Sequence, residues 1–165
     1  MTRHHKLNSV VQPDAAGEEK AAASSRWSVI RNTAALYAVV ALGSVIGAVL
    51  RALVSLGILH QFGPAFPWGT LFVNVTGSFA IGFYAALTGP DGRLFVGPRQ
   101  RQFVMTGICG GYTTFSAFSL ETLRLVQTGN LPAAGLNVGV SVITWLAAVW
   151  LGHILATGLN RLKGS

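Results

Sequence analysis

An apolar run, FVMTGICGGYTTFSAFSLETLRLV at positions 103–126, has a polar interruption at its centre. Two adjacent glycines, Gly110 and Gly111, and the pair Thr113 and Thr114 occupy positions where a stable helix prefers stronger helix formers. In the middle of a membrane, unsatisfied backbone groups are costly unless they line a cavity or bind an ion. The pattern therefore predicts a helix that is broken in mid-membrane; the alternative is a kink in a packed helix.

The composition of the whole chain places this run in lipid. Of the 165 residues, 51% are hydrophobic and only 10% are charged, against roughly 25% charged in a soluble domain. Eight of the charged residues fall within residues 1–32, so the rest of the chain is more apolar still. The net charge of +7 does not indicate nucleic-acid binding, because the basic residues lie between apolar runs and form no continuous stripe.

Four apolar runs, at 34–59, 68–87, 103–126 and 133–156, are each long enough to cross a hydrocarbon core of about 30 Å. We therefore predict an all-α integral membrane protein with four transmembrane helices per subunit, the third of them broken. Residues 33–158 form this membrane unit. Residues 1–32 have few apolar side chains and are expected to be a disordered cytoplasmic tail, and residues 159–165 a short basic tail.

The distribution of lysine and arginine predicts the orientation. With four spans, the N-terminal tail, the middle loop and the C-terminus share one side of the membrane, and they hold ten basic residues against one, Arg124, on the other side. The ten are Arg3, Lys6, Lys20, Arg26, Arg31, Arg93, Arg99, Arg101, Arg161 and Lys163. The positive-inside rule then places both termini in the cytoplasm of a multi-pass inner (plasma) membrane protein.

Aromatic and hydroxyl side chains follow the predicted break at helical spacing. Phe115 and Phe118 are three residues apart and share one helix face, and Ser116 and Ser119 share the adjacent face. Phenyl rings are positive at their edges, so ring edges can face an anion while hydroxyl and amide donors complete its coordination. The alternative is that both rings face lipid or fill a core.

Three further polar side chains interrupt apolar runs. Asn74 is the only amide in the second run, and it donates either to a permeating anion or to a neighbouring helix; the sequence favours neither. Arg51 lies well inside the first run, where an ionisable residue indicates function unless its side chain snorkels to the surface. Glu121 is the only acidic residue in the four runs, and we expect it to be hydrogen-bonded behind an anion path rather than exposed to it.

The fourth run has one polar face, on which Asn137, Ser141 and Thr144 recur at four and three residues. Such a face normally meets another helix. The single cysteine, Cys109, has no partner for a disulfide, and no Cys/His spacing suits zinc. Paired carboxylates, a Ser/His/Asp set and a phosphate loop are also absent, so the sequence does not indicate an enzyme.

Three blocks of sequence, GAVLR at 47–51, GTLFVNVTG at 69–77 and GGYTTFSAFS at 110–119, carry a family resemblance. Together with the four-run layout, they make residues 34–158 resemble the CrcB or Fluc family of small fluoride channels. Ala117 departs from the family pattern, which often has Thr there. The resemblance implies a passive, fluoride-selective channel that exports F⁻ and relieves fluoride toxicity. It also implies a dimer of oppositely oriented four-helix subunits with pores near the interface.

By this resemblance, Phe115 and Phe118 present ring edges to fluoride and Asn74 donates a hydrogen bond to it. Thr114, Ser116 and Ser119 would supply nearby hydroxyls, and Arg51 would lie at the aqueous vestibule. The resemblance further implies a structural Na⁺ at the dimer centre, bound by the backbone carbonyls of Gly110 and Thr113 and the same atoms of the partner. Glu121, Asn137 and Ser141 are expected to support these groups without contacting the ions.

The uneven distribution of lysine and arginine also affects which second subunit can complete the dimer. A homodimer of opposed subunits needs a chain that inserts both ways, whereas this chain is biased ten to one. We therefore expect either a homodimer or, as the bias indicates, a heterodimer with an oppositely oriented homologue. Two rival functions remain: a proton-coupled small multidrug exporter, which would need a carboxylate that run 34–59 lacks, and a non-conducting membrane subunit.

Overall fold

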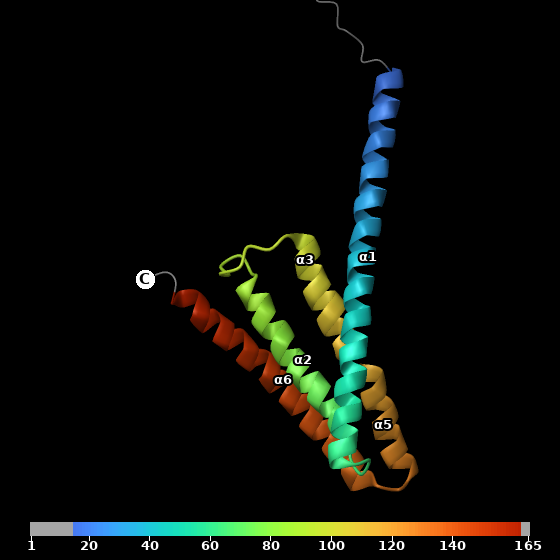
Figure 1. The fold of residues 1–165 in the computed structure, drawn as a ribbon, viewed down its shortest axis with the longest axis vertical. Helices are drawn as coiled ribbons and strands as arrows, with labels where there is room; N and C mark the ends of the chain where they lie inside the picture. Colours follow the sequence, from blue (N-terminus) through green and yellow to red (C-terminus); the bar gives the residue numbers. More distant parts are fainter. Residues whose placement is uncertain (1–14, 163–165) are drawn as a thin grey trace, which may run out of the picture. The chain divides into compact units, whose positions relative to one another are not determined.

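The computed structural model describes residues 15–162, and every regular element in that range is a helix (Figure 1). The elements are α1 (Ala15–Phe62), α2 (Trp68–Leu87), α3 (Pro98–Gln102), η1 (Phe103–Cys109, a π-helix), α4 (Gly110–Tyr112), α5 (Phe115–Gln127) and α6 (Leu131–Arg161). The chain divides into two compact units, Met1–Ala35 and Leu36–Ser165, with the boundary inside α1. The all-helical prediction is confirmed.

The first part of α1 differs from the sequence-based expectation. Residues 15–32, expected to be disordered, are helical, while residues 1–14 and 163–165 lie outside the described part. Alanine, glutamate and lysine are strong helix formers, and Glu18 lies in the first turn, where the helix dipole favours an acid. None of the described side chains between residues 17 and 32 is buried. Local propensity, not packing, therefore accounts for this helix.

Within residues 15–162, three helical segments are long and apolar enough to cross a membrane, judged by length and composition: Gly17–Phe62, Trp68–Leu87 and Leu131–Arg161. The second matches its predicted run at both ends. The third predicted run, 103–126, is divided among η1, α4 and α5, so that no single helix within it reaches the necessary length. The chain nevertheless has the composition and helix lengths of a membrane protein.

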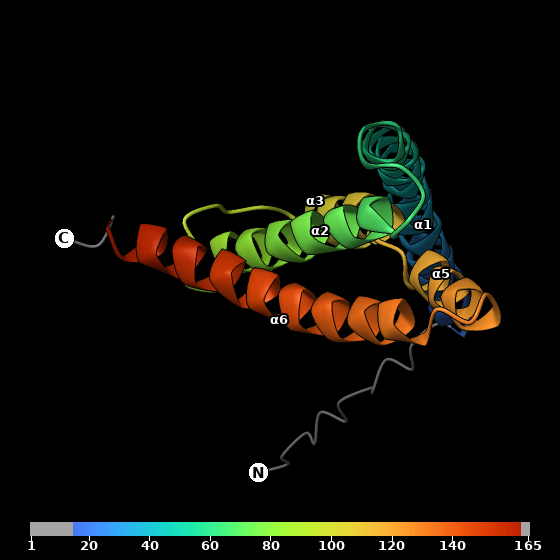
Figure 2. The same cartoon turned by 90° about the horizontal axis from the view of Figure 1, so that it is seen from below.

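The helices α2 and α6 form an extensive pair in the second unit, and they lie side by side along most of their lengths (Figure 2). Glycines permit this close approach. A Cβ atom at Gly82 would lie 2.3 Å from the carbonyl oxygen of Val149, and one at Gly152 would lie 2.3 Å from that of Phe79. Small residues at such contacts allow helix backbones to pack closely in lipid.

The second half of α1 packs against η1 and α4 in the same way. A Cβ atom at Gly47 would lie 2.2 Å from the carbonyl oxygen of Ile108, and one at Gly111 would lie 2.4 Å from that of Ser44. The atoms in contact here are backbone atoms, so a clash with an added Cβ atom could not be relieved by movement of a side chain. Gly111, the second glycine of the pair in the third run, therefore serves the close packing of α4 against α1.

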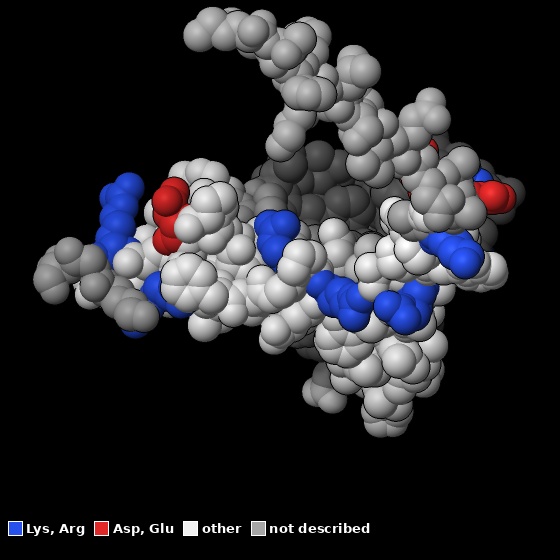
Figure 3. Space-filling model, turned by 90° about the horizontal axis from the view of Figure 1, so that it is seen from above, with Lys and Arg blue, Asp and Glu red and all other residues white. Residues whose placement is uncertain are grey.

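Basic residues gather where the α2–α3 loop meets the C-terminal end of α6. The backbone N–H of Arg93 donates to Asn160 Oδ1 (3.1 Å), and its Nη1 donates to the carbonyl of Leu159 (3.3 Å). Arg101 Nε donates to Thr88 Oγ1 (3.3 Å) across the same loop. Lys and Arg side chains are prominent in the view of the molecule from above (Figure 3). These hydrogen bonds join the α2–α3 loop to the C-terminal end of α6.

Candidate functional site

The helical run from α3 to α5 is interrupted by two extended residues. α4 ends at Tyr112, Thr113 has φ −80° and ψ 158°, and Thr114 has φ −152° and ψ 123° before α5 begins at Phe115. Gly110 itself keeps helical angles. The threonines, and not the glycines, therefore leave the helical conformation. The hydroxyl of Thr114 caps α5 by accepting a hydrogen bond from the backbone N–H of Ala117 (3.2 Å).

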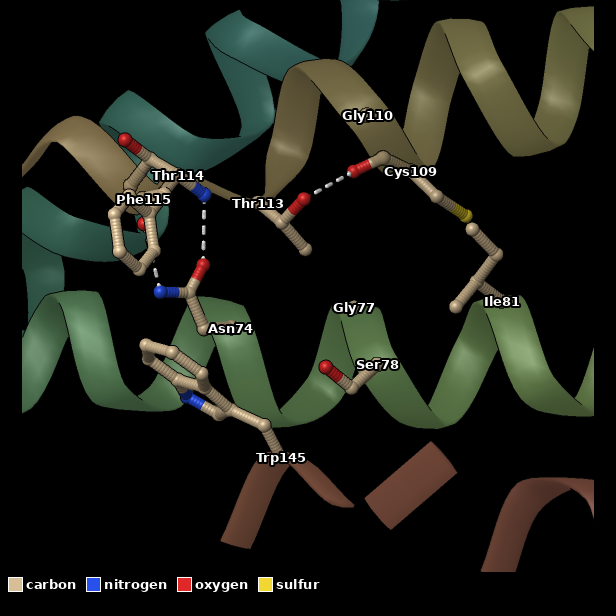
Figure 4. Close-up of a pocket in the computed structure, with 10 residues that line it drawn as sticks. All are labelled: Asn74, Gly77, Ser78, Ile81, Cys109, Gly110, Thr113, Thr114, Phe115 and Trp145. Carbon is tan, nitrogen blue, oxygen red and sulfur yellow. Dashed lines mark hydrogen bonds between the residues drawn. The ribbon is translucent and has the colours of Figure 1, made fainter. Parts of the chain in front are cut away.

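Asn74 pairs with the extended backbone across 40 residues of sequence. The N–H of Thr114 donates to Asn74 Oδ1 (2.7 Å), and Asn74 Nδ2 donates to the carbonyl of Thr114 (2.8 Å) (Figure 4). Only 4% of Asn74 is exposed. A carboxamide has two N–H donors, and this pairing uses one of them. One N–H of the Asn74 amide therefore binds the backbone of Thr114. The second N–H is the one that can donate a hydrogen bond to an anion.

A cavity of about 250 Å³ lies beside this pairing, between α2, the Thr113–Thr114 segment and α6. It is lined by Asn74, Gly77, Ser78, Ile81, Cys109, Gly110, Thr113, Thr114, Phe115 and Trp145 (Figure 4). None of these side chains is charged. Ser78 is a polar lining residue that the sequence analysis missed, although its place one turn after Asn74 on α2 was a usable signal.

The two phenylalanines of α5 lie in different environments. Phe115 is 71% exposed and Phe118 only 7%, and their ring centroids are 5.5 Å apart with the planes tilted by 49°. Phe118 meets Trp145 of α6 in an edge-to-face arrangement, with centroids 4.9 Å apart and an interplanar angle of 74°. Phe115 is therefore exposed on the single chain, whereas Phe118 is packed inside it, so the two rings do not share one environment. Three neighbouring rings link α5 to α6 at the cavity.

The serines of α5 do not line the cavity. Ser116 and Ser119 are both exposed on the single chain, as Phe115 is. Ser119 Oγ donates to the carbonyl of Phe115 (3.0 Å), and Ser116 Oγ lies 3.3 Å from Thr114 Oγ1. The expected hydroxyl ladder thus exists along α5, on a face that this chain leaves uncovered.

The polar face of α6 supports α5 from behind. Asn137 Nδ2 donates to Thr122 Oγ1 (2.9 Å), and Thr122 Oγ1 in turn donates to the carbonyl of Phe118 (2.8 Å). Ser141 Oγ lies 3.5 Å from Asn137 Oδ1. Asn137 and Ser141 are almost completely buried, and neither lines the cavity. Asn137 supports α5 through Thr122, and Ser141 contacts Asn137.

Glu121 and Arg51 lie away from the cavity at the break. Glu121 Oε1 accepts a hydrogen bond from Thr70 Oγ1 (2.8 Å), and its Oε2 is buried without a hydrogen-bond partner among residues 15–162. This carboxyl borders a second, larger cavity of about 810 Å³ together with Arg124, at the opposite end from the basic loop. Arg51, half-buried in α1, lines neither cavity.

The carbonyls of Gly110 and Thr113, expected to bind Na⁺, are hard oxygen ligands of the kind that a hard cation prefers. A Cβ atom at Gly110 would meet only the carbonyl oxygen of Met105, at 3.9 Å, so the space beside this residue is open. The extended ψ of Thr113 differs from that of the α4 residues before it. No group of three or more His, Cys, Asp or Glu residues suits a metal within the described chain. Backbone carbonyl and hydroxyl oxygens are thus the oxygen ligands that this region offers.

The match to a family model covers residues 38–153, which include the whole cavity; the model is described as CrcB-like protein, Camphor Resistance (CrcB). The chain belongs to the CrcB family.

Several relatives within the CrcB family are similar over most of their length. The fluoride-specific ion channel FluC 1 of Rhodopseudomonas palustris is 67% identical over 136 residues, which cover 82% of this chain and 96% of the relative. FluC 1 of Bradyrhizobium diazoefficiens is 57% identical over 86% of this chain and 96% of the relative. FluC of Opitutus terrae is 56% identical over 79% and 98%. This CrcB protein therefore matches nearly the full length of all three.

Proposed function

We propose that the chain is a fluoride-selective passive ion channel that exports F⁻ from the cytoplasm. The observation that carries this proposal is the uncharged cavity at the Thr113–Thr114 break, within the segment matched by the CrcB family. Relatives as much as 67% identical are named fluoride-specific ion channels. Neutral donors and ring edges at such a cavity suit a dehydrated halide, because they offer partial positive charge without a tightly binding cation.

The chain's own residues divide the work of this channel. Asn74 holds Thr114 extended and keeps one N–H for the anion, Phe115 lines the cavity, and Phe118 lies beside it, fixed by Trp145. Ser116 and Ser119 extend the donors along α5, and Arg51 attracts anions to the aqueous vestibule. No energy-coupling machinery is required, because an inside-negative membrane potential drives anions out of the cell. The free energy gained is about 2.3 kcal/mol per elementary charge for each 100 mV.

In this proposal the subunit crosses the membrane four times. The third crossing consists of α3, η1, α4 and α5, broken at Thr113 and Thr114. Both termini lie in the cytoplasm, and the chain resides in the inner (plasma) membrane. The ten-to-one distribution of basic residues and the junction of the basic α2–α3 loop with the end of α6 support this orientation.

The functional unit is an antiparallel dimer. Phe115, Ser116 and Ser119 form an uncovered face on α5 directly beside the cavity, which supports completion of the pore by a second subunit. The charge bias favours an oppositely oriented homologue as this partner, and a second copy of the chain is the alternative. A structural Na⁺ at the dimer centre, held by the carbonyls of Gly110 and Thr113 from both subunits, would supply a fixed positive charge between them.

Fluoride efflux from liposomes tests the function. The purified chain is reconstituted with internal KF or KCl, and release is followed with F⁻ and Cl⁻ electrodes after addition of a K⁺ ionophore. We expect rapid F⁻ release, little Cl⁻ release and loss of F⁻ release in Phe118→Ile. Phe95→Ile, which alters a 95% exposed loop ring, is the matched control and should conduct normally.

Failure of this experiment is informative only with the right partner present. If neither the chain alone nor the chain with an oppositely biased homologue releases F⁻, the non-conducting subunit is correct. Drug transport that depends on a proton gradient would instead establish the exporter. Replacement of Na⁺ by N-methylglucamine throughout purification should reduce F⁻ release, and full activity without Na⁺ would remove the structural cation from the proposal.

A further inference from the structure

A third cavity, of about 630 Å³, lies at the end of the subunit where α2 and α6 terminate, away from the proposed anion pathway. It is bounded by the last turn of α2, the turn that follows it, α3 and the last three turns of α6. Its ionisable lining residues are Asp91, Arg101, His153 and Arg161. This combination is unlike the uncharged cavity at the break, and the proposed fluoride channel has no use for it.

Helix C-termini ordinarily disfavour anions, because their last carbonyls point outward. Here several of these carbonyls are covered. Asn160 Nδ2 donates to the carbonyl of Ala86 at the end of α2 (3.0 Å), and Arg93 Nη1 donates to the carbonyl of Leu159 near the end of α6 (3.3 Å). The backbone N–H of Leu94 donates to the carbonyl of Leu87 (3.0 Å). The negative ends of both helices are thus partly neutralised before the cavity's own arginines are considered.

Two guanidinium groups are available to a ligand. Arg101 is anchored through Nε to Thr88 Oγ1 (3.3 Å), which leaves its two terminal nitrogens. Arg161 has no hydrogen bond or ion pair within residues 15–162. Asp91 is the acidic residue of the lining, and together with the two arginines it gives a net charge of +1. That charge matches the single negative charge of a phosphodiester.

The depth of the cavity favours an amphiphile over a free ion. His153 precedes Arg161 by eight residues on α6, which corresponds to about 12 Å along the helix axis. The cavity therefore extends from the basic end of the subunit toward the apolar middle of α6, past Ala85 and Ala86 of α2. A soluble anion would bind only at the basic end of the cavity. A lipid would place its headgroup at that end and its apolar part against the deeper, apolar lining.

We propose that this cavity binds the headgroup of an anionic glycerophospholipid, such as phosphatidylglycerol, with its phosphodiester between Arg101 and Arg161. Arginine is well suited to this role because its planar fork binds phosphate oxygens in a bidentate manner. Basic pockets between transmembrane helices bind anionic headgroups in this way. The ester region of the lipid lies toward His153, and its acyl chains follow the apolar surface of α6.

Native mass spectrometry of the full chain in detergent tests this site. The protein is mixed with phosphatidylglycerol and phosphatidylcholine of identical acyl chains, and the lipid adducts are compared. Each arginine near a phosphate contributes roughly a fivefold gain in binding, so Arg161→Gln should weaken phosphatidylglycerol retention about fivefold. Adding Arg101→Gln should remove the preference over phosphatidylcholine. Arg124→Gln, at the opposite end of the subunit, is the control and should change nothing.

Arg161→Gln is the decisive variant, because this exposed side chain makes no hydrogen bond or ion pair within residues 15–162. An unchanged thermal midpoint confirms that the fold is intact. Equal retention of the two lipids, or unaltered retention in Arg161→Gln, overturns the proposal. Displacement of phosphatidylglycerol by millimolar inorganic phosphate would also overturn it, because the cavity would then be a site for a soluble anion.

Discussion

Asn74 joins two parts of the chain whose relation the sequence does not reveal. It satisfies both backbone groups of Thr114, the residue at which the helix is interrupted. Asn74→Ala would leave this N–H and C=O unpaired in a buried position, at about 1–3 kcal/mol for each group. We expect a clearly lower thermal midpoint in detergent and loss of fluoride efflux.

The matched control for Asn74→Ala is Thr144→Val in α6. The hydroxyl of Thr144 bonds only carbonyls of its own helix, Val140 and Ser141, so its removal should alter neither the midpoint nor the efflux. A stable and fully active Asn74→Ala protein would show that the extended conformation at Thr114 does not depend on this amide.

Trp145 is expected to determine the orientation of the buried Phe118 ring. Their edge-to-face contact contributes about 0.5–1.5 kcal/mol beyond surface burial. Trp145→Leu removes the ring, so Phe118 should reorient and the ratio of F⁻ to Cl⁻ efflux should fall. Trp145→Phe keeps an aromatic edge and should retain most of that ratio.

Trp150→Leu, in the same helix but 62% exposed, is the control for this experiment. If Trp145→Leu and Trp150→Leu have the same F⁻ to Cl⁻ ratio as the unaltered chain, the tryptophan is packing alone. The edge-to-face contact with Phe118 is what gives Trp145 an expected role beyond packing.

At the level of helices, the sequence predicted the helix boundaries best where a long apolar run is expected to cross the membrane. The run 68–87 coincides with α2, and α6 extends the run 133–156 by a few residues at each end. The N-terminal extension of α1 was missed because its residues form a helix by local propensity without burying a face. The sequence predicted an interruption among residues 110–114 but not its exact position. The glycines at 110 and 111 indicated a weak helix as strongly as the threonines at 113 and 114 did, and only the threonines are extended.

The glycine contact of α1 with η1 and α4 should be intolerant of any side chain. Gly47→Ala places a methyl group 2.2 Å from the carbonyl oxygen of Ile108, so α1 must move away from the helix that precedes the break. We expect a lower thermal midpoint and a smaller monodisperse fraction on size-exclusion chromatography. Because the displaced group is backbone, repacking of side chains cannot relieve the clash.

Gly57→Ala, ten residues later in α1, is the matched control. A Cβ atom there meets nothing within 4 Å, and alanine is the better helix former by about 1 kcal/mol. This variant should be as stable as the unaltered chain or slightly more so. Equal behaviour of the two alanine variants would contradict the close approach of α1 and α4.

In the assembled channel, the identity of the partner subunit depends on the orientation in which this chain inserts into the membrane. In a Cys109→Ala background, Phe95→Cys marks the basic loop and Thr128→Cys the opposite end, and both positions are exposed. If the ten-to-one bias fixes a single orientation, an impermeant maleimide applied outside spheroplasts should label Thr128→Cys and spare Phe95→Cys. A channel of opposed subunits would then require a second, oppositely biased homologue. Labelling of both positions from outside would show insertion in both directions, and the chain would then be able to supply both halves of its own dimer.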